Sequence, residues 1–292
     1  MTKSKFRRIL AIILCVCAVA MAVLGAVSMP KRDSEVGEAI LSSMRIRTLL
    51  NATGEGVVES YVAIAKKEAT AEAKAAGGGM SAIREKKLIW VLSRLKIHLD
   101  GSPRYDDTVR VETYHNGVDR LFAKRQFVLS SATTGERFGY ASSFWLSVEV
   151  PAMRPRPPSS ALGLSLKDND DREDFFPHLD KLPIPENASD PVVHNIRASH
   201  IDLNDHLNNS YYCQYALDWV AKKIGKLVHF TELQINFNRA MQFGEDLVVS
   251  GTLDGEAFLV EGIDRESGKN SFVAQGKFRI ADGQTLVASL SS

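Results

Sequence analysis

The sequence has little cysteine and no excess of charge of either sign, and each of these shortages excludes some classes of protein. Only Cys15, Cys17 and Cys213 are present among 292 residues, too few for a disulfide framework. Cys15 and Cys17 have no partners at metal-ligand spacing, so we expect no metal site. The 36 basic and 35 acidic residues nearly cancel, and no basic stripe alternates with aromatic residues. This balance argues against nucleic acid as a partner.

One long hydrophobic run is present, near the N-terminus. Residues 9–30 carry no charge, and about 20 apolar residues in a helix can cross the hydrocarbon core of a bilayer. Four basic residues precede the run and two follow it, a bias that favours the N-terminus inside the cell. The sequence therefore predicts a separate segment, residues 1–30. It is either a membrane anchor through residues 9–29 or a signal peptide with a weak cleavage site at 26–28.

The rest of the chain repeats one order of elements. Alternating, β-branched and aromatic runs predict strands, and two longer stretches at residues 56–76 and 209–224 predict helices. Gly77, Gly78 and Gly79 end the first helix. The predicted strands are 44–50, 88–99, 108–114, 121–129 and 138–150 in the first copy, and 192–199, 229–238, 246–253, 258–263 and 272–280 in the second. One strand, one long helix and four strands, occurring twice, indicate an internal duplication.

Composition separates the two copies. Residues 153–190 are rich in proline, then acidic at 168–171, and show little periodicity, so they read as a linker. The predicted domains are therefore 40–152 and 191–288, joined by the linker 153–190. Both belong to the α+β class.

The densest group of reactive side chains follows the first strand of the second copy. Asp202, Asn204 and His206 alternate, and in an extended segment that spacing places them on one face. A carboxylate, an amide and an imidazole that titrates near pH 6.5 can together hold and polarise a water molecule beside a carbonyl. The simpler interpretation is a polar turn before a helix, with Asn208 or Asn209 as the N-cap. Both interpretations can hold together.

The pattern Asp-x-Asn-x-His-x-Asn-Asn at 202–209 resembles the second-domain motif of the acyl-acyl-carrier-protein thioesterases. Four first-domain segments are similar to motifs of the same family in the same order: 90–94 (WVLSR), 111–114 (VETY), 124–127 (KRQF) with Arg125, and 141–145 (ASSFW). The resemblance runs from about Met44 to the C-terminus. It implies a tandem (double) hot-dog, in which each antiparallel sheet wraps one long helix, and hydrolysis of fatty acyl-acyl carrier protein without a cofactor.

The resemblance also assigns site residues. Asp202, Asn204 and His206 match the catalytic aspartate, asparagine and histidine of the family, and Asn208 and Asn209 match its paired asparagines, for which we favour a structural role. An acyl-chain tunnel is expected beside the first helix. Its candidate lining residues are Trp90, Leu92, Phe144 and Trp145, although aromatic strand residues are more often ordinary core.

One departure from the family pattern weakens the assignment. The strand after the second helix commonly carries a glutamate in the family, and here Ala240 occupies that position. Three alternatives stay open: Asp202 is the only carboxylate, Glu232 or Glu245 substitutes, or activity is reduced. Cys213 lies on the predicted helix, where a buried thiol is the simplest expectation.

The expected partner is acyl carrier protein, whose acidic surface could meet basic residues around 66–87 or 222–226. Acyl-coenzyme A is an alternative substrate, and Ala240 favours a second alternative, a non-catalytic acyl- or carrier-protein-binding module. A homodimer is also left open. The apolar N-terminal segment predicts a protein outside the cytoplasm, whereas acyl carrier protein is found in the cytoplasm or in plastids. Three explanations stay open: translation starts at Met29, the segment anchors the enzyme on the cytoplasmic side of the membrane, or the protein is exported and acts on another thioester. We favour the cytoplasmic side.

Overall fold

The computed structural model describes residues 40–45, 87–103, 108–158, 171–202 and 204–281, the first range as backbone only. All of them belong to one unit, Gly37–Ser292. The predicted helix at 56–76 and the apolar segment at 9–29 therefore lie outside the described residues. Within the described part, none of the helices has both the length and the hydropathy needed to span a membrane.

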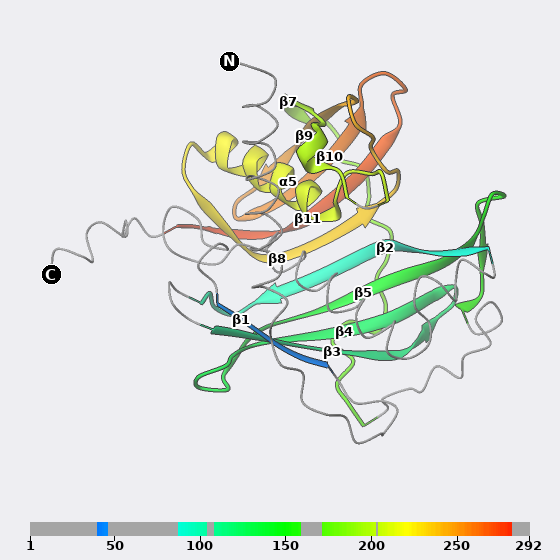
Figure 1. Ribbon diagram of the computed structural model, residues 1–292. Helices are drawn as coiled ribbons and strands as arrows, with labels where there is room; N and C mark the ends of the chain where they lie inside the picture. The colour runs from blue at the N-terminus through cyan, green and yellow to red at the C-terminus, as the bar shows by residue number, and fades with distance from the viewer. Residues whose placement is uncertain (1–39, 46–86, 104–107, 159–170, 203, 282–292) are drawn as a thin grey trace, which may run out of the picture. The chain divides into compact units, whose positions relative to one another are not determined.

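The strands form one antiparallel sheet (Figure 1). Most strands overlap the predicted runs over nearly their whole length, but β1 shares only residues 44 and 45 with the predicted strand 44–50, and the predicted strand 192–199 ends at residue 195. The strands of the first half are β1 (Ile40–Arg45), β2 (Leu88–Leu99), β3 (Thr108–Asp119), β4 (Phe122–Ser131), β5 (Arg137–Glu149) and the short β6 (Arg154–Arg156). Those of the second half are β7 (Ser189–Asn195), β8 (Val228–Phe237), β9 (Asp246–Asp254), β10 (Ala257–Asp264) and β11 (Asn270–Ile280). Because β6 pairs with β5, the predicted linker begins with a strand rather than with irregular chain.

The strand order confirms the duplication among the described elements. Outward from the middle the first half reads β2, β5, β4, β3, β1, and the second half reads β8, β11, β10, β9, β7. In the second half β8, the strand after α5, is central and β7, the strand before it, is at the edge; in the first half β2 is central and β1 is at the edge. The two halves join where β2 pairs with β8, from Arg94 opposite Asn236 to His98 opposite Glu232.

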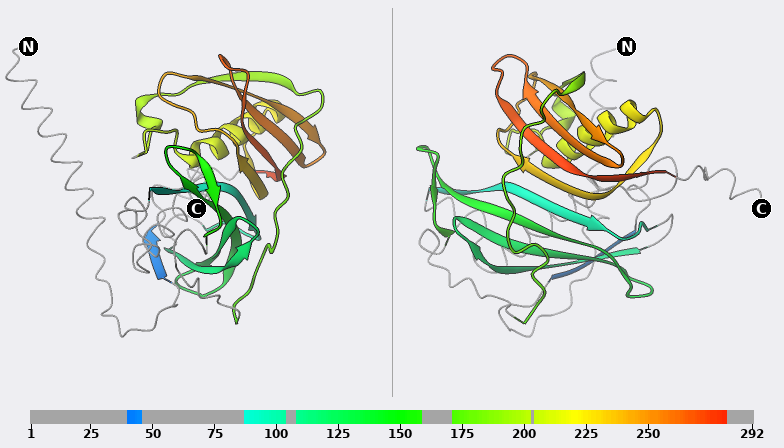
Figure 2. Two further views of the ribbon diagram at one scale, coloured as in Figure 1. Left: turned by 90° about the vertical axis from the view of Figure 1, so that its right-hand side faces the viewer. Right: turned by 180° about the vertical axis from the view of Figure 1, so that it is seen from behind.

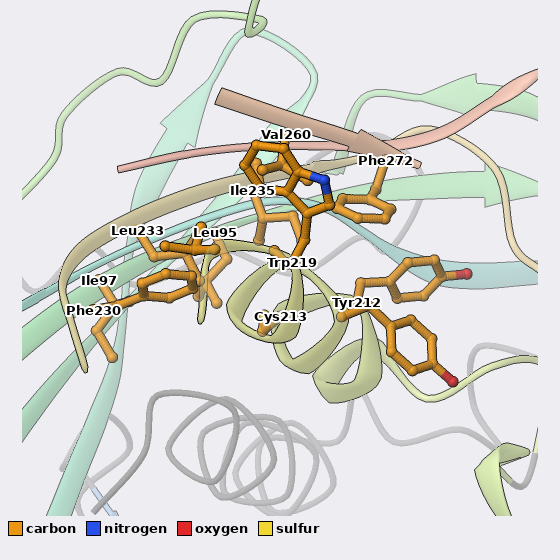
Figure 3. Packing of buried hydrophobic residues seen from close by; sticks show 14 of the residues in the cluster. Leu95, Ile97, Tyr212, Cys213, Trp219, Phe230, Leu233, Ile235, Val260 and Phe272 are labelled. Atoms are coloured by element: carbon orange, nitrogen blue, oxygen red, sulfur yellow. The ribbon is translucent and has the colours of Figure 1, made fainter. Parts of the chain in front are cut away.

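Helix α5 (Asn209–Ile224) occupies one face of the second half, as predicted to the residue (Figures 1 and 2). It begins at the N-cap Asn208, whose side chain accepts a hydrogen bond from the Ser210 N–H, and it ends at Gly225 with φ 72°. Its buried side chains include Tyr212 and Trp219, which pack among residues of the surrounding strands (Figure 3). The same hydrophobic cluster continues into β2 through Leu95 and Ile97.

The described end of the linker is a strap, which we define as residues 171–182. It lies against one face of the first half of the sheet, the face that carries Tyr114 and Gln126. The Tyr114 hydroxyl donates to Glu173 O at 2.6 Å, and the Gln126 amide donates to Asp174 Oδ1 at 2.8 Å. Arg94 of β2 donates to the carbonyl of Leu179, and Gln234 of β8 donates to Asp180 O at 2.8 Å. Three of these four contacts are partly buried, and together they place the strap against both halves of the sheet. The assignment of residues 153–190 as the linker between two domains stays a prediction.

His178 fastens the strap to the β3–β4 turn. Its ring nitrogens contact the carboxylates of Asp119 and Asp180, the latter at 3.0 Å, and the hydrogen bond with Asp119 is the main cause that raises the pKa of this exposed imidazole. Because the pKa of His178 is higher in the folded than in the unfolded protein, its interactions stabilise the fold fully at pH values below the unfolded-state pKa, near 6.5. This stabilisation is lost as the pH rises through the folded-state value.

We therefore expect the difference in Tm between the wild-type chain and His178→Gln to be largest near pH 5.5 and to shrink towards pH 8.5. Thermal unfolding at a series of pH values measures it. Asp119→Asn serves as the control, because removing the main partner should flatten the same pH dependence. A difference in Tm that stays constant over this range would contradict the assignment.

Candidate active site

The motif after β7 forms a tight hairpin rather than an extended segment. Ile201 and Leu207 pair in an antiparallel bridge, and the Asp202 N–H donates to His206 O at 2.8 Å. The Asp205 N–H closes a turn on Asp202 O at 3.1 Å, and Asp205 has φ 60°. This is the geometry of a three-residue hairpin loop, whose last residue must accept the left-handed region, as aspartate does better than most residues.

The hairpin, and not an extended segment, determines which of the polar residues share a face. Asp202 and His206 are opposite each other across the two arms, and directly opposed residues project to the same side. Asn204 lies in the turn and is exposed. The Asp202 carboxylate also accepts the Asn204 N–H at 2.8 Å, which fixes the aspartate within its own turn. The turn thus places Asp202 opposite His206 in the backbone pairing, with Asn204 at its tip.

A second segment, residues 238–245, lies against the hairpin, and we call it the Ala240 segment. The Leu207 N–H donates to Met241 O at 2.8 Å, and Gly244 and Glu245 exchange backbone hydrogen bonds with Ile196 at 2.8 and 2.9 Å. Ala240 is the neighbour of Met241 and is exposed. Ala240, which the resemblance aligns with the family glutamate, therefore lies one residue from the contact with the motif and offers no side-chain group for chemistry.

Neither alternative glutamate is presented to the motif. Glu232 forms an ion pair with Lys96 at 2.9 Å where β2 and β8 meet. Glu245 accepts from Arg239 at 3.0 Å with one carboxylate oxygen and from the Gln242 N–H at 2.7 Å with the other. Arg239 in turn pairs with the buried Asp264 at 2.7 Å. Both glutamates thus have structural contacts, and the role of Asp202 as the catalytic carboxylate stays a prediction.

The four candidate tunnel residues do not share one face. In the ladder, Leu92 is opposite Trp145 and Trp90 is opposite Ser147, so these three candidates project to one side. Phe144 precedes Trp145 on β5 and projects to the other side, where its ring contacts Phe122 at 6.1 Å. The expectation that Phe144 lines the same tunnel as Trp145 is wrong, because neighbouring strand residues alternate between faces.

Trp90 and Trp145 are partly buried, whereas Leu92 is buried. Trp145 Nε1 donates to Ser143 Oγ at 2.7 Å, which holds the indole on the face that carries Leu95 and Ile97. This polar anchor was not predicted from the sequence, although a serine two residues before a tryptophan on one strand places both on the same face. Arg125, on the neighbouring strand, donates to Thr113 Oγ1 at 3.3 Å, and burial lowers its pKa to about 10.

Cys213 and two histidines near the motif have structural positions. Cys213 is buried, as expected. His194 stacks on Tyr215 at 4.1 Å, and His200 Nδ1 lies 3.1 Å from the Tyr215 hydroxyl, so both histidines belong to an aromatic cluster. Burial is the main cause that lowers the pKa of both imidazoles. Among the described residues, no group of three histidine, cysteine or acidic side chains is placed to hold a metal ion.

A helix enclosed by an antiparallel sheet, in a duplicated strand order, defines the class as a tandem hot-dog protein. Two family models match the chain, the acyl-ACP thioesterase N-terminal domain at residues 45–157 and the acyl-ACP thioesterase C-terminal domain at 186–287. The chain therefore belongs to the acyl-ACP thioesterase family.

Solved structures agree on the fold. An acyl-ACP thioesterase from Bacteroides thetaiotaomicron has a TM-score of 0.71 at 22% identity, over 82% of this chain and 98% of that one. The 12:0-ACP thioesterase from Umbellularia californica has a TM-score of 0.70 at 18% identity, over 85% of this chain and all of that one. The predicted tandem hot-dog is confirmed.

Curated relatives are plant proteins. The oleoyl-acyl carrier protein thioesterase 1 of Arabidopsis thaliana is 26% identical over 58% of this chain and 49% of its own length. The palmitoyl-acyl carrier protein thioesterase of Gossypium hirsutum is 24% identical over 72% of this chain and 52% of its own length. The chain thus spans about half the length of the curated relatives that it matches.

The cap at Asn208 provides a test of how the hairpin is joined to α5. Asn208→Ala should remove the hydrogen bond to the Ser210 N–H and destabilise the protein by about 1 kcal/mol. Chemical denaturation measures this change. Asn208→Ser keeps a capping hydroxyl and should lose only a few tenths of a kcal/mol. Equal losses in the two variants would show that the side chain does not act as a cap.

Proposed function

We propose that the protein hydrolyses the thioester of fatty acyl-acyl carrier protein and releases a free fatty acid. The observation that carries the proposal is the pairing of Asp202 with His206 across a hairpin that lies against the Ala240 segment, in a chain whose two halves both match the family. The printed names of the curated relatives, which are acyl carrier protein thioesterases, support the same substrate.

The chemistry requires a water oxygen to attack the thioester carbonyl while a proton leaves that water. Asp202 and His206 project to one side of the hairpin and would position the water and take its proton. Asn204, exposed at the tip, would donate its side-chain amide to the reacting groups while negative charge develops on the carbonyl oxygen. Collapse of the tetrahedral intermediate breaks the carbon–sulfur bond. The proton returns to the thiolate of the carrier, and both products leave without any cofactor.

The specificity of the enzyme is proposed to reside in the first half. Trp90, Leu92 and Trp145 share one face of β2 and β5, so they would contact the acyl chain there. Asn208 and Asn209 are proposed to hold the start of α5 and not to take part in the reaction. The exposed Lys222, Lys223 and Lys226 would meet the acidic carrier, although Lys223 also pairs with Asp190.

The carrier and the location are further proposals. The same site could hydrolyse acyl-coenzyme A, and faster turnover of the carrier-protein substrate that weakens with salt would separate the two. We propose that the enzyme acts on the cytoplasmic side, where residues 9–29 would associate with the membrane.

His206→Ala and Asp202→Asn should each lower kcat by roughly 10²–10⁴-fold, because a positioned acid or base contributes about that much. Release of free fatty acid from a panel of acyl-carrier proteins measures it, with circular dichroism to establish that the fold is retained. Asp205→Asn is the matched control. It removes a charge from the same turn, keeps a residue that tolerates a positive φ, and should retain wild-type turnover. Unchanged turnover in His206→Ala would remove the imidazole from the mechanism.

Ala240 favours a second function, that of a non-catalytic acyl- or carrier-protein-binding module. In that case the wild-type chain binds acyl-carrier protein without hydrolysing it, and Ala240→Glu should create or greatly raise turnover. Ala240→Gln, which has the same size without the charge, should not. Wild-type turnover that Ala240→Glu leaves unchanged would instead establish that Asp202 suffices as the carboxylate.

A further inference from the structure

Tyr212 connects the two segments that meet at the candidate site. It lies one turn into α5, with its side chain almost fully buried at 2% exposure. Its ring packs edge-on against Phe237 and Phe272, with centroids 5.6 and 5.5 Å away, in the layer between α5 and the sheet (Figure 3). Apolar contacts of this kind fix the ring, so the position of the hydroxyl group is determined by the core.

The Tyr212 hydroxyl accepts a hydrogen bond from the Met241 N–H at 3.0 Å. The carbonyl of Met241 accepts from the Leu207 N–H at 2.8 Å, and Leu207 is followed by Asn208, the N-cap of the helix that carries Tyr212. The contacts thus close a ring from α5 through Met241 to the hairpin and back to α5. His206 and Ala240 are each the immediate neighbour of a member of this ring.

The other end of the segment is bound by Ser271, whose side chain also forms a hydrogen bond with Tyr212. Ser271 of β11 donates from its hydroxyl to Arg239 O at 2.7 Å, and the Arg239 N–H donates to Ser271 O at 3.0 Å. Arg239 and Met241 flank Ala240, so both of its neighbours have fixed peptide groups. Ser271 fixes the side nearest the sheet, and Tyr212 fixes the side nearest the hairpin. Burial raises the pKa of Tyr212, so its hydroxyl stays neutral near pH 7.

We propose that Tyr212 is a positioning residue of the hydrolase, whose hydroxyl holds the Ala240–Met241 peptide against the motif hairpin and so sets the placement of His206. The inference rests on the proposed thioester hydrolysis and adds to it a residue that does not touch the substrate. Ala240 has no side-chain group with which to bind the reacting groups, and the carboxylate of Glu245 is engaged by Arg239 and by the Gln242 N–H. The segment therefore contributes to the site through the position of its backbone.

Tyr212→Phe tests the proposal, because it keeps the packed ring and removes only the hydroxyl. We expect kcat to fall about 10- to 100-fold, the range that small misplacement of reacting groups can produce, with KM within twofold of wild type. Tyr211→Phe is the matched control. Tyr211 is half-buried, its ring contacts His200 and Tyr215, and none of the hydrogen bonds found among the described residues uses its hydroxyl. It should retain wild-type kcat and KM.

A double variant separates positioning from stability. In the His206→Ala background, Tyr212→Phe should lower the residual rate by less than twofold, because the group that it places is absent. A full 10-fold loss in that background, an effect confined to KM, or wild-type kcat in Tyr212→Phe would each overturn the proposal. If Tyr212→Phe does not fold, Ser271→Ala removes the tether on the other side of Ala240, and wild-type kcat in that variant would overturn it equally.

Absence of turnover in the wild-type chain would refute the proposed hydrolysis and not the positioning role. Amide hydrogen exchange then decides. Tyr212→Phe should speed exchange at Met241 and Leu207 at least 10-fold relative to Tyr211→Phe, since both amides belong to the ring of contacts. Equal exchange in the two variants would overturn the positioning role.

Discussion

The pairing of β2 with β8 is the contact on which the rest of the architecture depends. It joins two sheets of the same strand order into one and covers a strand edge of each half. Because β2 and β8 run antiparallel, the chain that leaves β8 beyond Phe237 heads towards the early part of β2, where Trp90 and Leu92 lie. The register of one short ladder therefore brings the end of β8, from which the Ala240 segment continues, towards the face proposed for the acyl chain.

Two other features keep that register. The strap crosses from Arg94 in one half to Gln234 in the other, so it bridges the two strands that form the junction. The hydrophobic cluster likewise includes Leu95 and Ile97 of β2 together with side chains of α5 and β8. A displacement of one half against the other would have to break polar contacts on one face and apolar packing on the opposite face.

Much of this could be predicted from the sequence, because periodicity and turn residues act locally. The bounds of α5 follow from an asparagine cap and a glycine end, and the strands follow from alternation between turns. The bulge between Leu92 and Arg94 was not foreseeable, yet it keeps Leu92, Leu95 and Ile97 on one face. The error over Phe144 arose from grouping aromatic residues by motif without applying the alternation of a strand.

At the candidate site the limits of sequence reasoning were of another kind. The residues of the motif were identifiable, but their arrangement was not, since a three-residue hairpin loop and an extended segment are compatible with the same letters. Tyr212 and the motif contact Met241, which lies about thirty residues further along the chain. No local pattern reports such a contact, because it is created when α5 and β8 pack together.

The duplicated strand order also has a consequence for how the two halves can change over generations. In a dimer of two identical chains each copy would carry the same motif, and every substitution would appear in both. Here the stretch between β1 and the first predicted helix, residues 46–56, reads IRTLLNATGEG and lacks the alternating acid, amide and imidazole of 202–206. With the halves covalently joined, one copy can keep the hairpin that is proposed to be reactive. Selection on the other copy is then free to act on the shape of its apolar face.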